Sequence, residues 1–84
     1  MELHQALGIV IKRERNRRGL TQETVSHNGG IDITYLRDIE RGRCNPSIDI
    51  IDRVATGLGV ELTSLISQAK EEQLRAKASL PDAD

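Results

Sequence analysis

The sequence lacks phenylalanine and tryptophan, and it has a single tyrosine among its 84 residues. A hydrophobic core built from this chain must therefore be aliphatic. A chain of this length buries only about 60% of the surface that its unfolded form exposes, so we expect one small domain that gains further burial by self-association. Hydrophobic residues make up 37% of the chain and charged residues 30%, a composition typical of a folded domain.

Cysteine is equally scarce. Cys44 has no second cysteine with which to form an internal disulfide, and its spacing to His4 and His27 is not that of zinc ligands. We therefore expect no metal and no cofactor, and a reducing, cytoplasmic environment. The sequence also offers no catalytic grouping, because Ser26 and the adjacent His27 point to different faces of a helix. An enzyme is not expected.

Long hydrophobic runs are absent too. No window approaches the roughly 18 to 20 apolar residues that a membrane span needs, and the N-terminal region has no apolar stretch of signal-peptide length. The expected protein has no membrane partner and stays in the cytoplasm.

Positive charge is concentrated near the N-terminus, although the net charge is only -1. Residues 1–18 carry Lys12, Arg13, Arg15, Arg17 and Arg18 against two glutamates, while acidic residues predominate downstream. Such asymmetry favours one face that binds a polyanion. A solvated helix face is the alternative.

Apolar residues at helical spacing predict five helices, over about residues 3–18, 22–27, 32–41, 48–58 and from 62 to an end between 66 and 79. The predicted N-caps are Thr21, Asp32 and Ser47. Inward positions are expected at Val25 and Ser26 of the second helix, at Tyr35, Leu36 and Ile39 of the third, which should span about three turns, and at Ile48, Ile51, Val54, Ala55 and Leu58 of the fourth. Residues 80–84 are expected to fray.

The second and third predicted helices are separated by the pair Gly29-Gly30, which is expected to end one helix and let the chain turn sharply before the next. Two helices packed at a steep angle over a tight turn form a helix-turn-helix, whose second helix enters the DNA major groove. The helix pattern alone has low specificity for this motif.

Four stretches carry a more specific signal: residues 8–15 (GIVIKRER), 19–23 (GLTQE), 30–42 (GIDITYLRDIERG) and 45–48 (NPSI). In order and spacing they resemble the Cro and phage-repressor type of helix-turn-helix, the XRE family, over about residues 7–66. The resemblance implies an all-α, five-helix fold and a regulator that binds double-stranded DNA. We therefore expect a DNA-binding domain over residues 1–69, and a C-terminal helix extension and tail over 70–84.

The resemblance also implies roles for individual residues. A recognition helix over about residues 32–41 would contact base edges through Ile33, Thr34, Arg37 and Asp38. Expected phosphate contacts are Gln22, Tyr35, Arg41, Arg43 and Asn45, and Gln22 is also expected to buttress the third helix. Arg15 and Glu40 match a structural ion pair between the first and third helices. Many family members have serine where Arg37 stands, so this chain is expected to prefer different bases, and a solvated helix face is the alternative for the whole set.

We expect a homodimer on a roughly palindromic operator, with a dimer surface at Ile50, Leu62, Leu65 and Leu74, although Leu65 could equally be a core residue. Phage repressors, antitoxin-type regulators and restriction-modification controller proteins are equally compatible with the sequence. RNA polymerase is a further candidate partner, through the acidic residues Asp49, Asp52 and Glu61. The alternative from another class is a protein-interaction adaptor that kept the fold without binding DNA.

Overall fold

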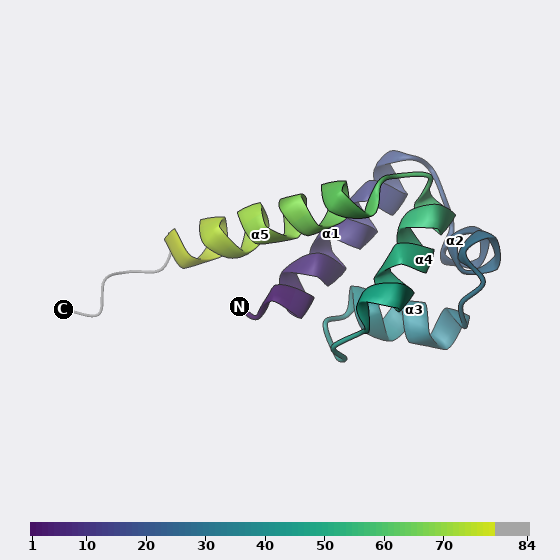
Figure 1. The fold of residues 1–84 in the computed structure, drawn as a ribbon, viewed down its shortest axis with the longest axis horizontal. Coiled ribbons are helices and arrows are strands. Elements are labelled where there is room, and N and C mark those ends of the chain that lie inside the picture. The colour runs from purple at the N-terminus through teal and green to yellow at the C-terminus, as the bar shows by residue number, and fades with distance from the viewer. Residues whose placement is uncertain (79–84) are drawn as a thin grey trace.

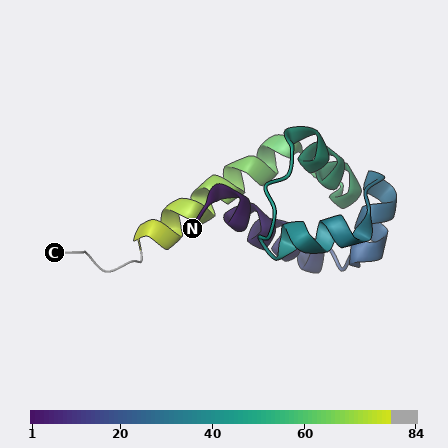
Figure 2. The same cartoon turned by 90° about the horizontal axis from the view of Figure 1, so that it is seen from below.

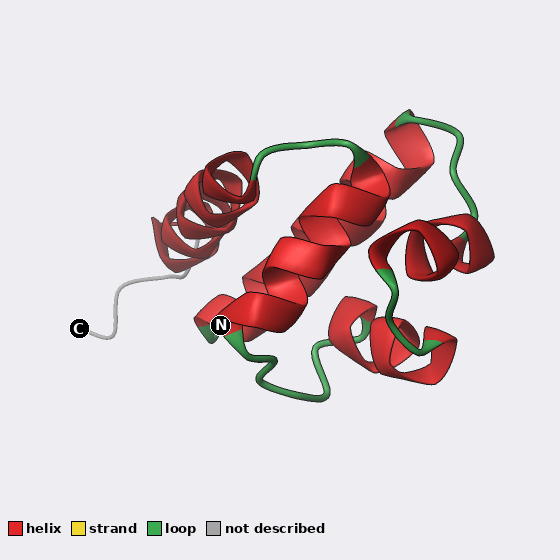
Figure 3. Cartoon of the chain, turned by 45° about the vertical axis from the view of Figure 1, so that its right-hand side comes forward, coloured by secondary structure: helices red, strands yellow, loops and turns green. Residues whose placement is uncertain are grey.

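The computed structural model describes residues 1–78, and its regular elements in this part of the chain are all α-helices (Figure 1). The expected all-α fold with five helices is confirmed, and short loops join the helices (Figure 3). The helices in chain order are α1 (Leu3–Arg17), α2 (Gln22–Gly29), α3 (Ile33–Glu40), α4 (Ile48–Leu58) and α5 (Leu62–Ala78). The expected fraying of residues 80–84 lies outside the described residues.

Three side-chain oxygens cap the helix starts, as predicted from the sequence. Thr21 Oγ1 accepts a hydrogen bond from Thr24 N at 3.0 Å, and Ser47 Oγ accepts one from Ile50 N at 3.2 Å. The carboxylate of Asp32 caps α3. Each cap satisfies backbone N–H groups that have no partner inside the helix, which fixes where α2, α3 and α4 begin.

The double glycine behaves differently from the prediction. The helix α2 continues to Gly29, two residues beyond the predicted end at His27, and Gly30 alone takes a positive φ of 67° as its C-cap. The close approach of α4 requires a residue without a side chain at Gly29, because a Cβ built there would lie 2.4 Å from the carbonyl oxygen of Arg53. The third helix is also shorter than expected, with eight residues, or about two turns.

The core is aliphatic, as the composition predicts. Its buried members come from all five helices: Ala6, Leu7, Val10, Ile11, Val25, Leu36, Ile39, Ile51, Val54, Ala55, Leu58, Leu65 and Ala69. The expected inward positions Tyr35 and Ile48 are wrong, because their side chains are 37% and 60% exposed. Ile48 is the first residue of α4 and precedes the turn that faces the core, while Tyr35 lies on the outer side of α3.

The helices α2, α3 and α4 gather at one end of the molecule, and α5 lies along α1 (Figures 1 and 2). Arg13 of α1 pairs with Glu72 of α5 at 3.2 Å, and Gln73 Nε2 donates a hydrogen bond to the carbonyl oxygen of Met1 at 3.3 Å. These contacts attach the second half of α5 to its own α1. None of the helices within residues 1–78 has the length and apolar character that crossing a bilayer requires.

Candidate nucleic-acid interface

The helices α2 and α3 meet across a connection of three residues, 30–32. Ile31 N donates a hydrogen bond to Ser26 O at 3.0 Å, which closes the end of α2. Directly afterwards Asp32 Oδ1 accepts from Thr34 N at 2.7 Å and from Tyr35 N at 3.3 Å, which opens α3. The pair therefore has the connectivity of a helix-turn-helix.

One side of α3 is held in the core by Leu36 and Ile39, which are 0% and 1% exposed. The four predicted base contacts lie on the same helix and are all accessible: Ile33, Thr34, Arg37 and Asp38. Thr34 and Arg37 are exposed and the other two are half-buried. This face of α3 is therefore exposed to solvent at Thr34 and Arg37.

The predicted ion pair between Arg15 and Glu40 is present and joins α1 to α3. Arg15 Nε lies 2.7 Å from Glu40 Oε2, and Arg15 Nη2 lies 2.9 Å from Oε1, so the guanidinium engages both carboxylate oxygens. The side chains are 11% and 4% exposed. The hydrogen bonds that Arg15 donates to Glu40 hold the pKa of Arg15 above its ordinary value. A third contact, from Arg15 Nη1 to Leu20 O at 3.0 Å, ties the pair to the loop before α2.

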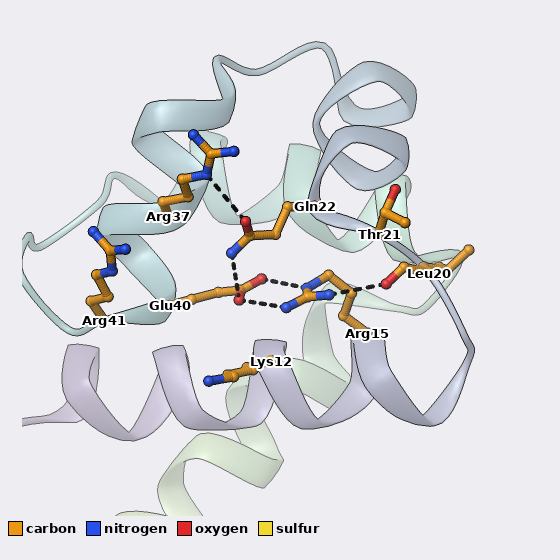
Figure 4. A pocket seen from close by; sticks show the side chains of 8 residues that line it. All are labelled: Lys12, Arg15, Leu20, Thr21, Gln22, Arg37, Glu40 and Arg41. Carbon is orange, nitrogen blue, oxygen red and sulfur yellow. Dashed lines mark hydrogen bonds and ion pairs between the residues drawn. The ribbon is translucent and has the colours of Figure 1, made fainter.

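Gln22, the first residue of α2, extends this pair to the recognition helix (Figure 4). Its Nε2 donates to Glu40 Oε1 at 3.1 Å, and its Oε1 accepts from Arg37 Nε at 3.2 Å. The sequence predicts Gln22 as a phosphate contact and Arg37 as a base contact, and the structure places the two in direct contact.

A hollow of about 410 Å³ opens beside these side chains, where α1, α2 and α3 meet (Figure 4). We call it the cationic hollow; it is lined by Lys12, Arg15, Leu20, Thr21, Gln22, Arg37, Glu40 and Arg41. Four of these side chains are cationic and one is a carboxylate, so a net positive charge surrounds the opening. Lys12 is a member that the sequence reasoning missed, although the excess of basic residues in 1–18 pointed to its segment.

A second hollow, of about 380 Å³, lies on the outer side of α3. We call it the Cys44 hollow; its lining residues are Asp32, Thr34, Tyr35, Asp38 and Cys44. Burial raises the pKa of the Cys44 thiol, and the nearby carboxylate of Asp38 raises it further. The sequence reasoning did not assign Cys44 to the interface, although it lies between two predicted phosphate contacts in the chain.

The remaining predicted phosphate contacts follow α3. Arg41, Arg43 and Asn45 are exposed, and Tyr35 is exposed beside the Cys44 hollow. Among residues 1–78, neither Arg41 nor Arg43 has a carboxylate within ion-pair distance. Their charges are therefore not neutralised within the described part of the chain.

The other arginines of the first helix region are paired with carboxylates. Glu14 is buried and accepts from Arg17 Nη2 at 2.9 Å and from Arg18 Nε at 3.3 Å. Burial acts to raise the pKa of Glu14, but the hydrogen bonds and the positive charges of Arg17 and Arg18 together outweigh it, and the pKa is lowered. Arg13 pairs with Glu72. Much of the positive charge in residues 1–18 thus has a local partner.

Of the four residues considered for the dimer surface, Leu65 takes the alternative role, in the core. Leu65 is 0% exposed and belongs to the core, because it lies on the side of α5 that packs against the rest of the chain. Leu74 is 54% exposed, and Ile50 and Leu62 are half-buried against the core. These three remain accessible to a partner.

A model of the helix-turn-helix family matches residues 11–65, which include α2 and α3. The chain belongs to the helix-turn-helix family. The uncharacterized HTH-type transcriptional regulator y4dJ of Sinorhizobium fredii is 35% identical over 71 residues, covering 84% of this chain and 92% of y4dJ. The immunity repressor protein of Bacillus phage phi105 is 37% identical over 70 residues, covering 80% of this chain and 49% of the repressor. The chain thus spans about half the length of the phage repressor.

Among solved structures, the helix-turn-helix chain resembles the restriction-modification controller protein C.Esp1396I, with a TM-score of 0.79, 30% identity, and coverage of 88% of this chain and 97% of the controller. The resemblance to repressors of the XRE type is thereby confirmed, as is the fold. Family membership and the regulator relatives support DNA-binding transcriptional regulation as the function, in preference to an adaptor without DNA binding.

Proposed function

We propose that this helix-turn-helix protein binds one DNA sequence as a homodimer, with α3 of each copy in the major groove. The accessible face of α3 is the observation that carries this proposal. Ile33, Thr34, Arg37 and Asp38 lie there, while Leu36 and Ile39 hold the opposite side of the helix in the core. The B-DNA major groove is wide enough for a helix, and its base edges are distinguishable there.

Each base contact has a chemical preference. The Arg37 guanidinium matches the O6 and N7 acceptors of guanine, and the Asp38 carboxylate accepts from the N4 amino group of cytosine. Thr34 donates or accepts a single hydrogen bond, and the apolar Ile33 packs on a thymine methyl group. The combination favours a half-site in which G·C pairs are read by the two charged residues.

Phosphate contacts supply affinity around this face. The proposed contacts are Gln22, Tyr35, Arg41, Arg43 and Asn45. The unneutralised charges of Arg41 and Arg43 support their role, because every cation placed on a phosphate releases counterions from the DNA. The net charge of -1 does not oppose binding, since Glu14, Glu40 and Glu72 are already paired with arginines.

A second copy would bind through the outer side of α5 and the neighbouring part of α4. Leu74, Leu62 and Ile50 are the proposed contacts; the exposure of Leu74 supports the assignment, and the other two are half-buried. The opposite side of α5 is occupied by α1 of the same chain. A two-fold axis would set the recognition helices about 34 Å apart, one turn of DNA, and would require a roughly palindromic operator.

The proposed role is regulatory and non-enzymatic, and it would place the protein on the nucleoid in the cytoplasm. We assign DNA binding to residues 1–69, and we treat the later part of the chain, to residue 84, as an extension that supports dimer formation. Activation would require contact with RNA polymerase. The exposed acidic residues Asp49, Asp52 and Glu61 are the surface proposed for that contact.

Selection of binding sites from a pool of random DNA duplexes tests the proposal. We expect the pool to converge on one palindromic consensus whose half-sites are separated by one helical turn. Convergence on a sequence without two-fold symmetry would contradict the homodimer, and no enrichment would contradict sequence-specific binding.

A further inference from the structure

Gly8 of α1 is buried against the C-terminal end of α3. A Cβ built on Gly8 would lie 2.2 Å from the carbonyl oxygen of Ile39 and 3.0 Å from that of Glu40. Ile39 O also accepts a hydrogen bond from Gly42 N at 3.1 Å, so the turn after α3 holds this oxygen in place. The two helices therefore meet backbone to backbone, at a point with no room for a side chain at position 8.

The same face of α1 holds the last residue of α3 a second time. Arg15 follows Gly8 by seven residues, or about two helical turns, so both residues face α3. The Arg15 guanidinium contacts the Glu40 carboxylate at 2.7 and 2.9 Å, between α1 and α3 (Figure 4). Glu40 is thus held at its backbone by Gly8 and at its carboxylate by Arg15, which sets the distance between the two helices.

The N-terminal end of α3 is held independently of α1. Asp32 Oδ1 accepts from Thr34 N at 2.7 Å and from Tyr35 N at 3.3 Å, and the connection 30–32 joins this end to α2. One end of α3 is therefore fixed by its cap and the connection, and the other end by α1. A change at Gly8 would tilt α3 rather than move it as a whole.

We propose that Gly8 is a positioning residue for DNA sequence recognition, because its lack of a side chain sets the tilt of α3 in the major groove. This inference rests on the proposed DNA binding. An added methyl group would push the end of α3 away from α1 by about 1 Å, since a backbone carbonyl cannot rotate aside. Over the length of α3, about 12 Å, this displacement is a tilt of about 5°.

The tilt would act unequally on the base contacts. Arg37 and Asp38 belong to the second turn of α3, close to the displaced end, and a shift of about 1 Å is enough to break a hydrogen bond of ordinary length. Ile33 and Thr34 belong to the first turn, next to the Asp32 cap, and would keep their positions. Discrimination would be lost at particular base pairs, which a general loss of stability does not produce.

Gly8→Ala tests the positioning role. The base pairs are first assigned by the preference that Thr34→Ala and Arg37→Ala each lose on the selected duplex. Discrimination at each pair is then the ratio of the dissociation constants for the changed and the selected duplex. In Gly8→Ala this ratio should fall about 2- to 20-fold at the pair read by Arg37, less than the roughly 5- to 150-fold that a complete bidentate contact supplies. It should stay unchanged at the pair read by Thr34, and equal losses at both pairs would contradict the proposal.

Gly57→Ala is the matched control, because a Cβ on Gly57 would lie 2.3 Å from the carbonyl oxygen of Val25, in a contact between α4 and α2. It adds the same methyl group at an equally close backbone contact and leaves the contact between α1 and α3 intact. It should lower the thermal stability without a selective loss at the pair read by Arg37. If Gly57→Ala reproduces the selective loss, Gly8 has no special role in positioning α3.

Gln5→Ala gives a second test that adds no bulk. The Gln5 side chain packs against the turn after α3, because a Cβ on Gly42 would lie 3.2 Å from Gln5 Cγ. Truncation of Gln5 loosens the same end of α3, so discrimination should again fall at the pair read by Arg37 and not at the pair read by Thr34. An unselective effect of Gln5→Ala would count against the proposal even if Gly8→Ala fails to fold.

A measurement without DNA separates this inference from the proposed function. In the free protein, residual dipolar couplings of the backbone N–H groups report the angle between α1 and α3. Gly8→Ala should change this angle by about 5°, and Gly57→Ala should leave it unchanged. An unchanged angle in Gly8→Ala would overturn the positioning role, whereas failure of the wild type to enrich any duplex would overturn DNA recognition, whatever the angle.

Discussion

Gly29 of α2 packs against the backbone of Arg53 in α4, so closely that a Cβ at position 29 would lie 2.4 Å from the Arg53 carbonyl oxygen. Gly57 of α4 makes the reciprocal approach, because a Cβ there would lie 2.3 Å from the carbonyl oxygen of Val25. The first helix of the helix-turn-helix is thus set by backbone contact with α4 at two points. A backbone carbonyl cannot rotate away as a side chain can.

This contact predicts that Gly29→Ala destabilises the protein. Alanine is normally the better helix residue by about 1 kcal/mol, whereas overpacking costs about 1–3 kcal/mol. We expect overpacking to prevail here, with a net loss of up to about 2 kcal/mol in the free energy of unfolding, measured by urea denaturation. The adjacent, exposed Asn28→Ala is the control and should be neutral or slightly stabilising. A stabilised Gly29→Ala variant would contradict the close packing of α2 on α4.

The buried carboxylate of Glu14 predicts that the stability of the protein depends on pH in the acidic range. Folding lowers the pKa of Glu14 from its ordinary value of 4.5. Its ionised form therefore stabilises the protein at pH values above the unfolded-state pKa, and this contribution is lost as the pH falls through the folded-state pKa. The free energy of unfolding should therefore fall less steeply between about pH 5 and pH 3 in Glu14→Gln than in the wild type.

The arginine partners of Glu14 provide the matched comparison. Burial alone would raise the pKa of Glu14, so replacing both Arg17 and Arg18 by methionine should flatten or reverse its contribution to the pH dependence. Wild-type slopes in both Glu14→Gln and the double arginine variant would show that this carboxylate does not titrate with folding.

The raised pKa of Cys44 predicts slow alkylation. At neutral pH the thiol should react with iodoacetamide more slowly than a free cysteine, because burial and Asp38 both disfavour the thiolate. Asp38→Asn should accelerate the reaction, since it removes the nearby negative charge. The selected DNA duplex should protect Cys44, which shares its hollow with Thr34 and Asp38. Equal rates with and without bound DNA would place the duplex elsewhere.

The leucines of α5 predict two different consequences of substitution. Leu74 is 54% exposed, so Leu74→Asp should weaken dimer formation in sedimentation equilibrium while the thermal stability of the monomer is retained. Leu65 is fully buried, so Leu65→Ala should cost about 2–5 kcal/mol of stability. A Leu74→Asp variant that dimerises like the wild type would exclude the outer side of α5 as the interface.

Local chemistry made most of this fold predictable. Thr21, Asp32 and Ser47 cap helices because their side-chain oxygens serve backbone groups only a few residues away. The same local logic failed at Gly29, whose role depends on α4, a helix that is distant in the chain. It also failed for Ile48, where helical periodicity identifies an apolar residue but not what covers it.

The contacts of the candidate site were likewise predictable only in part. The resemblance to the family implied the contact between Arg15 and Glu40, which the structure contains. The resemblance implied that Gln22 buttresses the third helix, but not its hydrogen bond to Arg37, because many family members have serine where Arg37 stands. Cys44 was missed because a lone cysteine has no partner in the sequence to indicate where it lies.

The central claim is that α3 distinguishes bases while the residues after it bind phosphates. The most direct test measures the dissociation constants of the wild type, Arg37→Ala and Arg43→Ala at several salt concentrations. Each protein is titrated with the selected duplex and with a shuffled duplex. Arg43→Ala should weaken both complexes and lower the salt slope by about one unit, whereas Arg37→Ala should relax preference at one base position. Equal losses on both duplexes for the two variants would contradict the account.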